Sequence, residues 1–353
     1  MEAKETAVQA RLLAWYQKDG RKLPFRGTKD PYLIWISETM LQQTQTGTAA
    51  GYYLRFIARF PDVQSLAAAD QQEVLKLWEG LGYYSRARNL HKAALTVAGE
   101  MNGQMPSTAA ALRSLSGIGP YTAAAIASIA YHEPLPAMDG NLTRVISRLY
   151  LVEEDVGIPG VKRRLYQLGL GLMPEDRAGD MNQALMDLGA TICLPGTPDC
   201  PACPLQSSCA AYEAGEPERL PLLPLKKPPR VIPLAVVILT CGGKVLVSRR
   251  EEALLRGLYV FHLIEHQSSQ AAAAKALRLP EGQLKFLGRA RHVFTHRVWE
   301  MSIYHAEVSS EGISQQGLWA TRDELATLPF PTAMRAARAL AQELLGGGKE
   351  GEG

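Results

Sequence analysis

Residues 115–141 read LSGIGPYTAAAIASIAYHEPLPAMDGN, and this stretch decides the fold of the N-terminal part of the chain. The turn formed by Gly117 and Gly119 lets two helices meet closely, with Pro120 in the first turn of the second helix. Free amides at such a helix start hold a phosphate without reading sequence. Asp139 follows this helix and has two interpretations: a turn or capping aspartate, or a carboxylate beside a sugar whose phosphate the hairpin holds.

Outward from this hairpin, the chain changes composition once. Residues 1–213 have the apolar spacing of helices, and Asp30-Pro31 is typical of a helix start. Residues 214–230 contain five prolines and are expected to form a linker. Residues 231–345 alternate as β-strands with two helices, and residues 346–353 are expected to be disordered. The prediction is a multidomain protein, with an all-α domain followed by a smaller α+β domain.

The bulk composition sets limits on the partners. The 353 residues suit two domains, and the net charge of +3 permits nucleic-acid binding without indicating it. No apolar run is long enough to span a membrane, and the N-terminus lacks the apolar stretch of a signal peptide. We therefore expect a cytoplasmic protein, associated with no membrane and monomeric.

Four of the five cysteines form a C-x6-C-x2-C-x5-C cluster at the end of the helical region: Cys193, Cys200, Cys203 and Cys209. Four thiolates within seventeen residues can converge on one centre. Thiolates suit either zinc or an iron–sulfur cluster, so spacing alone leaves both metals open. Unrelated buried cysteines are the third interpretation.

Two further segments carry chemistry. Glu38 follows an apolar run on the helix expected after Asp30, and burial would raise its carboxyl pKa and keep the proton available for acid catalysis. The alternative is an exposed helix glutamate.

Residues 81–88 read LGYYSRAR and interleave aromatic with cationic side chains, a pattern that can wedge a ring between bases while arginines hold phosphates. A buried tyrosine pair is the alternative there.

Taken together, the hairpin, the aspartate and the cysteine loop resemble the helix-hairpin-helix glycosylase superfamily, and within it the MutY-type adenine glycosylases. The resemblance covers nearly the whole chain and implies a [4Fe–4S] cluster at the four cysteines. It implies duplex DNA with adenine opposite 8-oxoguanine or guanine as substrate. The segment ISETMLQQTQT resembles the family's catalytic helix, which places Glu38 as the acid, with Asp139 as the second carboxyl group. Tyr121 and Asn141 would organise this pair.

The same resemblance implies the residues that contact DNA. Gln43 and Thr44 fall where the family contacts the 8-oxoguanine side. Tyr83 is assigned as the wedge, beside Leu81 and Arg86, and the hairpin glycines hold phosphate. In the C-terminal domain, Phe294, Thr295 and His296 correspond to a Phe-Ser-His element that reads 8-oxoguanine. By strand alternation, Phe294 and His296 are expected on one face, although ordinary hairpin packing is the simpler interpretation.

Two differences from the sequence patterns of related enzymes limit the reactions that we expect. Lyase-competent relatives place a lysine after the hairpin glycines, whereas this chain has Tyr121, so we expect base removal without efficient β-elimination. The C-terminal domain resembles the Nudix fold but lacks the acidic helix that holds metal ions in Nudix hydrolases. Three rival functions remain: a lyase-type glycosylase for oxidised pyrimidines, a catalytically silent lesion-binding protein, and a nucleotide-pool pyrophosphatase.

Overall fold

The computed structural model describes residues 2–225, 228–309 and 317–346. Contacts group the chain into two units. Unit 1 contains Met1–Ala68 and Asn89–Leu225, and unit 2 contains Ala69–Arg88 and Lys226–Gly353. Across the described residues, none of the helices combines the length and the apolar character that a membrane crossing requires.

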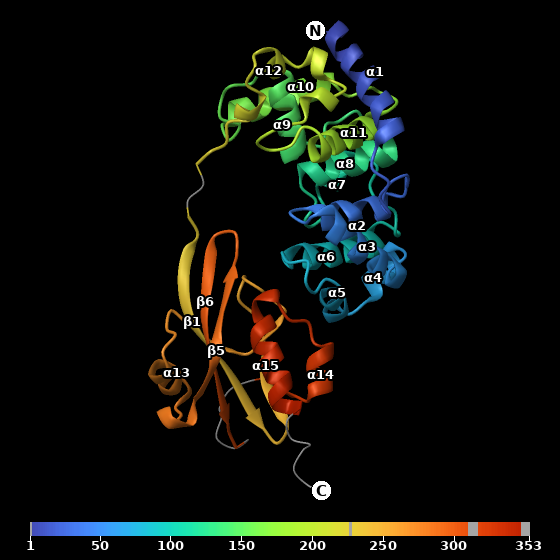
Figure 1. Ribbon diagram of the computed structural model, residues 1–353. Helices are drawn as coiled ribbons and strands as arrows, with labels where there is room; N and C mark the ends of the chain where they lie inside the picture. The colour runs from blue at the N-terminus through green and yellow to red at the C-terminus, as the bar shows by residue number, and fades with distance from the viewer. Residues whose placement is uncertain (1, 226–227, 310–316, 347–353) are drawn as a thin grey trace. The chain divides into compact units, whose positions relative to one another are not determined.

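Unit 1 is built from helices and loops, as the apolar spacing predicted (Figure 1). Its helices are α1 (Glu2–Asp19), α2 (Pro31–Leu41), α3 (Thr46–Arg59), α4 (Val63–Ala68), most of α6 (Ser85–Glu100), α7 (Ala109–Leu112), α8 (Pro120–Tyr131), α9 (Gly140–Leu149), α10 (Pro159–Gly171), α11 (Ala178–Thr191) and α12 (Ala210–Glu213). Three short 3-10 turns follow in the C-terminal part of the unit: η1 (Cys200–Ala202), η2 (Gln206–Ser208) and η3 (Pro217–Arg219).

The expected helix starts are confirmed. The side chain of Asp30 accepts a hydrogen bond from the Tyr32 amide at 2.8 Å, which caps α2. In the hairpin, α7 and α8 pack together across the glycine turn. Gly117 has a φ of +79°, and a Cβ there would lie 2.6 Å from the Cβ of Asn89. Only glycine therefore satisfies both the backbone conformation and the close approach.

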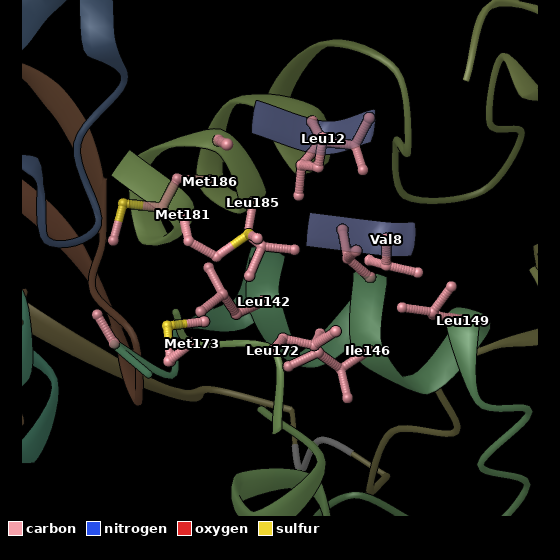
Figure 2. Close-up of a cluster of buried hydrophobic side chains, with 14 of the residues drawn as sticks. Val8, Leu12, Leu142, Ile146, Leu149, Leu172, Met173, Met181, Leu185 and Met186 are labelled. Atoms are coloured by element: carbon pink, nitrogen blue, oxygen red, sulfur yellow. The ribbon is translucent and has the colours of Figure 1, made fainter. Parts of the chain in front are cut away.

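The main core of unit 1 lies among α1, α9, α10 and α11 (Figure 2). Figure 2 shows Leu12 of α1, Leu142 of α9 and Leu185 of α11 contributing to one apolar cluster. The helices α9 and α11 approach closely because α11 has a glycine at position 189. A Cβ on Gly189 would lie 2.7 Å from the Cβ of Asn141, so this glycine sets where Asn141 lies.

Unit 2 contains a mixed seven-stranded sheet of order β3-β2-β1-β6-β5, in which β4 pairs with β1 and β7 pairs with β2. Strand β1 runs parallel to β6 and antiparallel to β2 and β4. The predicted strand runs and the two predicted helices are confirmed: β1 (Arg230–Cys241), β2 (Lys244–Arg249), β3 (Tyr259–Val260), β4 (His262–Glu265), α13 (Gln270–Leu277), β5 (Lys285–Val293), β6 (Arg297–Glu307) and α15 (Arg335–Gly346). The structure adds a short strand β7 (Leu318–Ala320) and a short helix α14 (Arg322–Thr327).

Two hydrophobic clusters lie on opposite faces of this sheet. One contains Trp299, Met301 and Phe330 with the buried side of α15. The other contains Val237, Tyr304 and the alanines of α13. The sheet is therefore the middle layer of a three-layer domain (Figure 1).

The contact grouping differs from the expected domain bounds in one respect. Residues 69–88, which contain α5 (Gln71–Leu77), were placed in the helical domain but group with unit 2. The physical reason lies in polar contacts: the Lys76 amine donates to the carbonyls of Ala326 and Leu328, and Arg338 pairs with Glu79 at 2.5 Å. The second boundary, at Leu225, falls inside the expected linker. Residues 347–353 of the expected tail lie outside the described residues.

Candidate active site

Glu38 lies in the last part of α2 and is only 3% exposed. The hydroxyl of Tyr121, at the start of α8, donates a hydrogen bond to the Glu38 Oε2 atom at 2.5 Å. Burial raises the pKa of Glu38 and the nearby Asp139 adds to this, while the Tyr121 hydrogen bond and the Arg26 charge act in the opposite direction. The expected buried, protonatable carboxyl group is therefore confirmed as a structural feature.

The structure shows the first of the two interpretations of Asp139, a capping aspartate, and the second, a carboxylate beside the sugar, stays a prediction. Asp139 is the N-cap of α9, because its Oδ1 atom accepts the Leu142 amide at 2.7 Å. Its Oδ2 atom accepts a hydrogen bond from the Asn141 side chain at 3.0 Å. Burial raises the pKa of Asp139, against the lowering effect of these hydrogen bonds and of Arg144. The cap holds the carboxyl group in a fixed orientation, which suits an electrostatic role as well.

Tyr121 and Asn141 both contact a carboxyl group, so the structure brings all four predicted catalytic residues into contacting pairs. Asn141 is fixed from its other side by Arg144, which donates to its Oδ1 atom at 2.8 Å. Arg144 also donates to the Cys193 carbonyl at 2.7 Å. Asp139 is thereby connected through Asn141 and Arg144 to the loop that carries the cysteines.

Sequence reasoning missed a buried ion group on α11. Asp187 is 0% exposed and pairs with Arg21 at 2.7 Å and with Arg26 at 3.2 Å. Arg21 also donates its backbone amide to Asp187, so the carboxylate is almost fully satisfied. Nothing in the local sequence marks Asp187, because its partners are more than 160 residues away along the chain.

We predict that Asp187→Ala lowers the free energy of unfolding of unit 1 by about 3–5 kcal/mol, because it leaves two partly buried arginines without their counter-charge. Asp180→Ala is the matched control on the same helix. Its carboxylate pairs with Arg177 at 2.9 Å but is 38% exposed, so the expected loss is below about 1 kcal/mol. Denaturant unfolding followed by fluorescence measures both. Equal losses in the two variants would contradict the role of Asp187.

The predicted DNA-contacting residues Gln43 and Thr44 lie beyond the end of α2. Helix α2 ends at Leu41, and Gln43 adopts a left-handed turn with a φ of +57°. Gln43 is exposed and Thr44 is half-buried. Gln42 points back to the hairpin, where its amide donates to the Thr122 hydroxyl at 2.9 Å. The turn therefore presents Gln43 to solvent.

In residues 69–88, the predicted wedge residue Tyr83 is more exposed than the predicted DNA-contacting residue Leu81. Tyr83 is 47% exposed with a left-handed φ of +46°, whereas Leu81 is buried. The guanidinium of Arg86 lies over the rings of Trp78 and Tyr83 at 5.5 and 5.4 Å, and burial lowers its pKa to about 10. Arg86 thus packs against the ring of the exposed Tyr83 and supports it through a cation–π contact.

The expectation that Phe294 and His296 share a strand face is wrong. Strand β5 ends at Val293 and β6 begins at Arg297, so residues 294–296 form the loop of the hairpin. Phe294 is half-buried, with its ring 5.0 Å from that of Trp299, and the hairpin-packing interpretation applies to it. Thr295 and His296 are exposed. Within unit 2, the hydroxyls of Thr295 and Tyr83 lie 3.1 Å apart.

The four cysteines line one small cavity after α11. Burial, and then repulsion between the sulfurs, raises the thiol pKa values of Cys200, Cys203 and Cys209, in Cys203 to about 12. Arg148 is 2% exposed and donates to the Cys193 sulfur at 3.3 Å and to the Leu194 carbonyl at 2.8 Å. The loop therefore gathers four sulfurs beside a buried cation, an arrangement that favours thiolate over thiol once a bound group supplies further positive charge.

Comparison with known proteins places this site. The profile of the HhH-GPD superfamily base excision DNA repair proteins matches residues 36–168, and that of the NUDIX domain matches residues 234–340. The adenine DNA glycosylase of Mus musculus is 34% identical and covers 94% of this chain and 77% of its own length. The adenine DNA glycosylase of Homo sapiens is 33% identical, and the match covers 94% of this chain and 73% of the human protein.

The chain belongs to the adenine DNA glycosylase family. Among solved structures, a thermostable thymine-DNA glycosylase matches with a TM-score of 0.55 at 30% identity, covering 60% of this chain and 98% of that one. A trapped endonuclease III–DNA covalent intermediate matches with a TM-score of 0.52 at 19% identity, which shows the helix-hairpin-helix fold alone. Family membership identifies the protein as a DNA glycosylase of base excision repair.

Proposed function

We propose that this protein hydrolyses the N-glycosidic bond of adenine opposite 8-oxoguanine or guanine in duplex DNA, as a cytoplasmic monomer. The observation that carries the proposal is the buried Glu38 carboxyl group, hydrogen-bonded by Tyr121, near the fixed carboxylate of Asp139. One acidic group that retains its proton and one that stabilises cationic charge are the two groups that glycosidic cleavage requires. The family relationship supports adenine as the base removed.

In the proposed mechanism, adenine is flipped out of the duplex at a cost of a few kcal/mol of stacking energy. Glu38 donates its proton to the base, at N7, so that adenine leaves as a neutral molecule. As the bond breaks, the sugar gains oxocarbenium character. Asp139 stabilises this charge or adds to the anomeric carbon before water attacks. Asn141 holds the Asp139 carboxylate through its hydrogen bond.

We infer that the cysteine loop holds a [4Fe–4S] cluster. A single zinc ion would draw the four sulfurs to within about 3.8 Å of one another, given a Zn–S distance of about 2.3 Å. Among the described residues, no group of three or more Cys, His, Asp or Glu side chains is arranged to hold one metal ion. The four cysteines line one cavity, a donor set that suits a cluster with one thiolate on each iron, and the family relationship supports the cluster over zinc. When bound, the cluster supplies positive charge and a rigid cross-link for the loop.

The first test is a single-turnover assay on duplexes with adenine opposite 8-oxoguanine, guanine or thymine, with and without alkali. We expect cleavage of the adenine strand only after alkali, and fastest opposite 8-oxoguanine. No adenine release by cluster-loaded protein would overturn the proposal and favour a silent lesion-binding protein. Release of oxidised pyrimidines would favour the lyase-type rival, and hydrolysis of 8-oxo-dGTP would favour the pyrophosphatase.

We expect little covalent trapping of the wild-type protein on substrate DNA by borohydride. A Schiff base needs an amine beside the anomeric carbon, and the corresponding position holds Tyr121, whose hydroxyl is bound to Glu38. Among the residues that the structure describes, no lysine forms a hydrogen bond or an ion pair with either carboxyl group. A trapped fraction equal to that of a lyase-competent relative on its own substrate would contradict this expectation.

We expect a bell-shaped dependence of the single-turnover rate on pH. Activity is lost as pH rises through the elevated pKa of Glu38, because the acid loses its proton. Activity is also lost as pH falls through the pKa of Asp139, because the protonated carboxyl no longer stabilises a cation. Tyr121→Phe removes a hydrogen bond that lowers the pKa of Glu38, so its high-pH limb should move to higher pH. A shift to lower pH would contradict this assignment.

A further inference from the structure

One face of the sheet in unit 2 is covered over only part of its length. Helix α13 packs over the part formed by Val237, Tyr304 and their neighbours. Toward the other end, Val231 is 51% exposed and Val293 is 56% exposed. Among the described residues of unit 2, no helix covers this second part, which lies on the side of the sheet opposite α15.

A cavity of about 500 Å³ opens on this uncovered part. Strands β1, β5 and β6 form its floor, and Ser268, just before α13, forms a wall. The wall is held by Tyr304, whose hydroxyl donates to the Ser268 carbonyl at 2.7 Å. The volume lies within the range of small-molecule sites and is far larger than a single inorganic ion needs.

The charged side chains of the cavity are arranged in register. Arg289 lies opposite Ser302, and Arg291 lies opposite Glu300. The two arginines are two positions apart on one strand, so their side chains lie on the same face of the sheet and their Cα atoms are about 7 Å apart. Both arginines are exposed, and neither side chain makes a hydrogen bond or ion pair with another residue that the structure describes, including Glu300 opposite Arg291.

We propose that this cavity binds the phosphate group of a nucleotide, with Arg289 and Arg291 as its ligands. Guanidinium groups match phosphate oxygens in geometry and charge, and two unpaired ones on one face provide a paired anion site. Ser302 and Ser268 supply further hydrogen-bonding groups beside them. Glu300 accepts hydrogen bonds only, so it suits an amino or hydroxyl group of the base or sugar and opposes the phosphate.

The proposed role is binding and not hydrolysis. Residues 266–279, which include α13, read HQSSQAAAAKALRL and contain no carboxylate, and Glu300 is the single carboxylate among the described residues that line the cavity, whereas pyrophosphate cleavage uses metal ions held by an acidic cluster. The phosphate can come from a free mononucleotide or from the backbone of a DNA strand. Both sources share the same chemistry at the two arginines. This inference is independent of the chemistry proposed for Glu38 and Asp139.

The test uses the full chain, loaded with its cluster, and calorimetric titration with dGMP, deoxyguanosine and inorganic phosphate. If free nucleotides are the ligand, dGMP binds at least tenfold more tightly than deoxyguanosine. Replacing both Arg289 and Arg291 with Gln then weakens dGMP binding at least tenfold. The matched control is Arg335→Gln, an exposed arginine on α15, and it leaves the affinity unchanged.

A second arm addresses DNA as the source of the phosphate. If DNA phosphates occupy the site, the dependence of the association constant for an undamaged duplex on salt concentration becomes weaker. The slope of log K against log[salt] becomes less negative by about 0.9 for each arginine replaced. Glu300→Gln should strengthen the binding of inorganic phosphate severalfold, because this probe feels only the repelling charge, and such a gain is not explained by misfolding. The proposal is overturned if the double variant matches Arg335→Gln in both dGMP affinity and salt slope, or if Glu300→Gln weakens the binding of inorganic phosphate.

Discussion

Glu38→Gln should lower the single-turnover rate of adenine release by about 10²–10⁴-fold, the range that a positioned acid contributes. The amide keeps the size of the buried side chain and can still accept the Tyr121 hydrogen bond, but it has no acidic proton. DNA affinity should stay within about twofold, because the carboxyl group is 3% exposed and not a phosphate ligand. Quenched-flow or manual single-turnover assays on adenine opposite 8-oxoguanine measure the rate.

The matched control for this variant is Glu154→Gln, which removes an exposed glutamate paired with Arg164. It should retain the wild-type rate, since exposed ion pairs contribute little to stability. The absorbance of the cluster reports whether unit 1 is intact in both proteins. Wild-type activity of the Glu38→Gln protein would contradict the assignment of Glu38 as the acid.

Asp139→Asn should lower the same rate by about 10²–10³-fold, the effect of removing one preorganised electrostatic group. Asparagine caps helices as well as aspartate does, so the hydrogen bond from the Leu142 amide survives and the cap of α9 is retained. The hydrogen bond from the Asn141 amide is lost, because the new amide nitrogen cannot accept it, which costs about 1 kcal/mol at most. The substitution therefore separates the charge of this residue from its structural role. The measurement is the single-turnover rate together with the thermal unfolding midpoint.

The comparison variant is Asp139→Ala, which removes both charge and cap. It should lose activity and about 1 kcal/mol of stability as well. If Asp139→Asn is as active as the wild type while Asp139→Ala is not, then Asp139 is only a cap. If both lose activity but only Asp139→Ala loses stability, the carboxylate acts on the sugar.

Much of the candidate site could be predicted because its residues stand in local patterns. Asp30-Pro31 starts α2, and the run of apolar residues before Glu38 places that carboxyl on a buried helix. Gly117 and Gly119 followed by Pro120 predict the hairpin turn, and the φ of +79° at Gly117 agrees with this prediction. These signals depend on neighbours within a few residues, so they can be read without the tertiary structure.

Other predictions failed or were never made because they depend on packing between distant segments. Strand alternation gave the wrong position for Phe294, since alternation does not extend into the loop that ends β5. Asp187 carries no local signal, although it neutralises Arg21 and Arg26 in the interior. The arginine pair in the unit 2 cavity also went unnoticed, because β5 reads as an ordinary amphipathic strand.

The sequence by itself determined the succession of a helical and a sheet-containing domain, the start of α2 at Asp30-Pro31, most of the strand runs, the four-cysteine spacing and the two candidate carboxyl groups. Each of these follows from hydrophobic periodicity, capping or turn chemistry, which act over short stretches of chain. Only the tertiary structure decided that the Tyr121 hydroxyl meets Glu38, that Asn141 links Asp139 to Arg144, and that residues 69–88 group with unit 2. These features depend on which buried polar groups find partners far along the chain, and such pairings leave no local pattern.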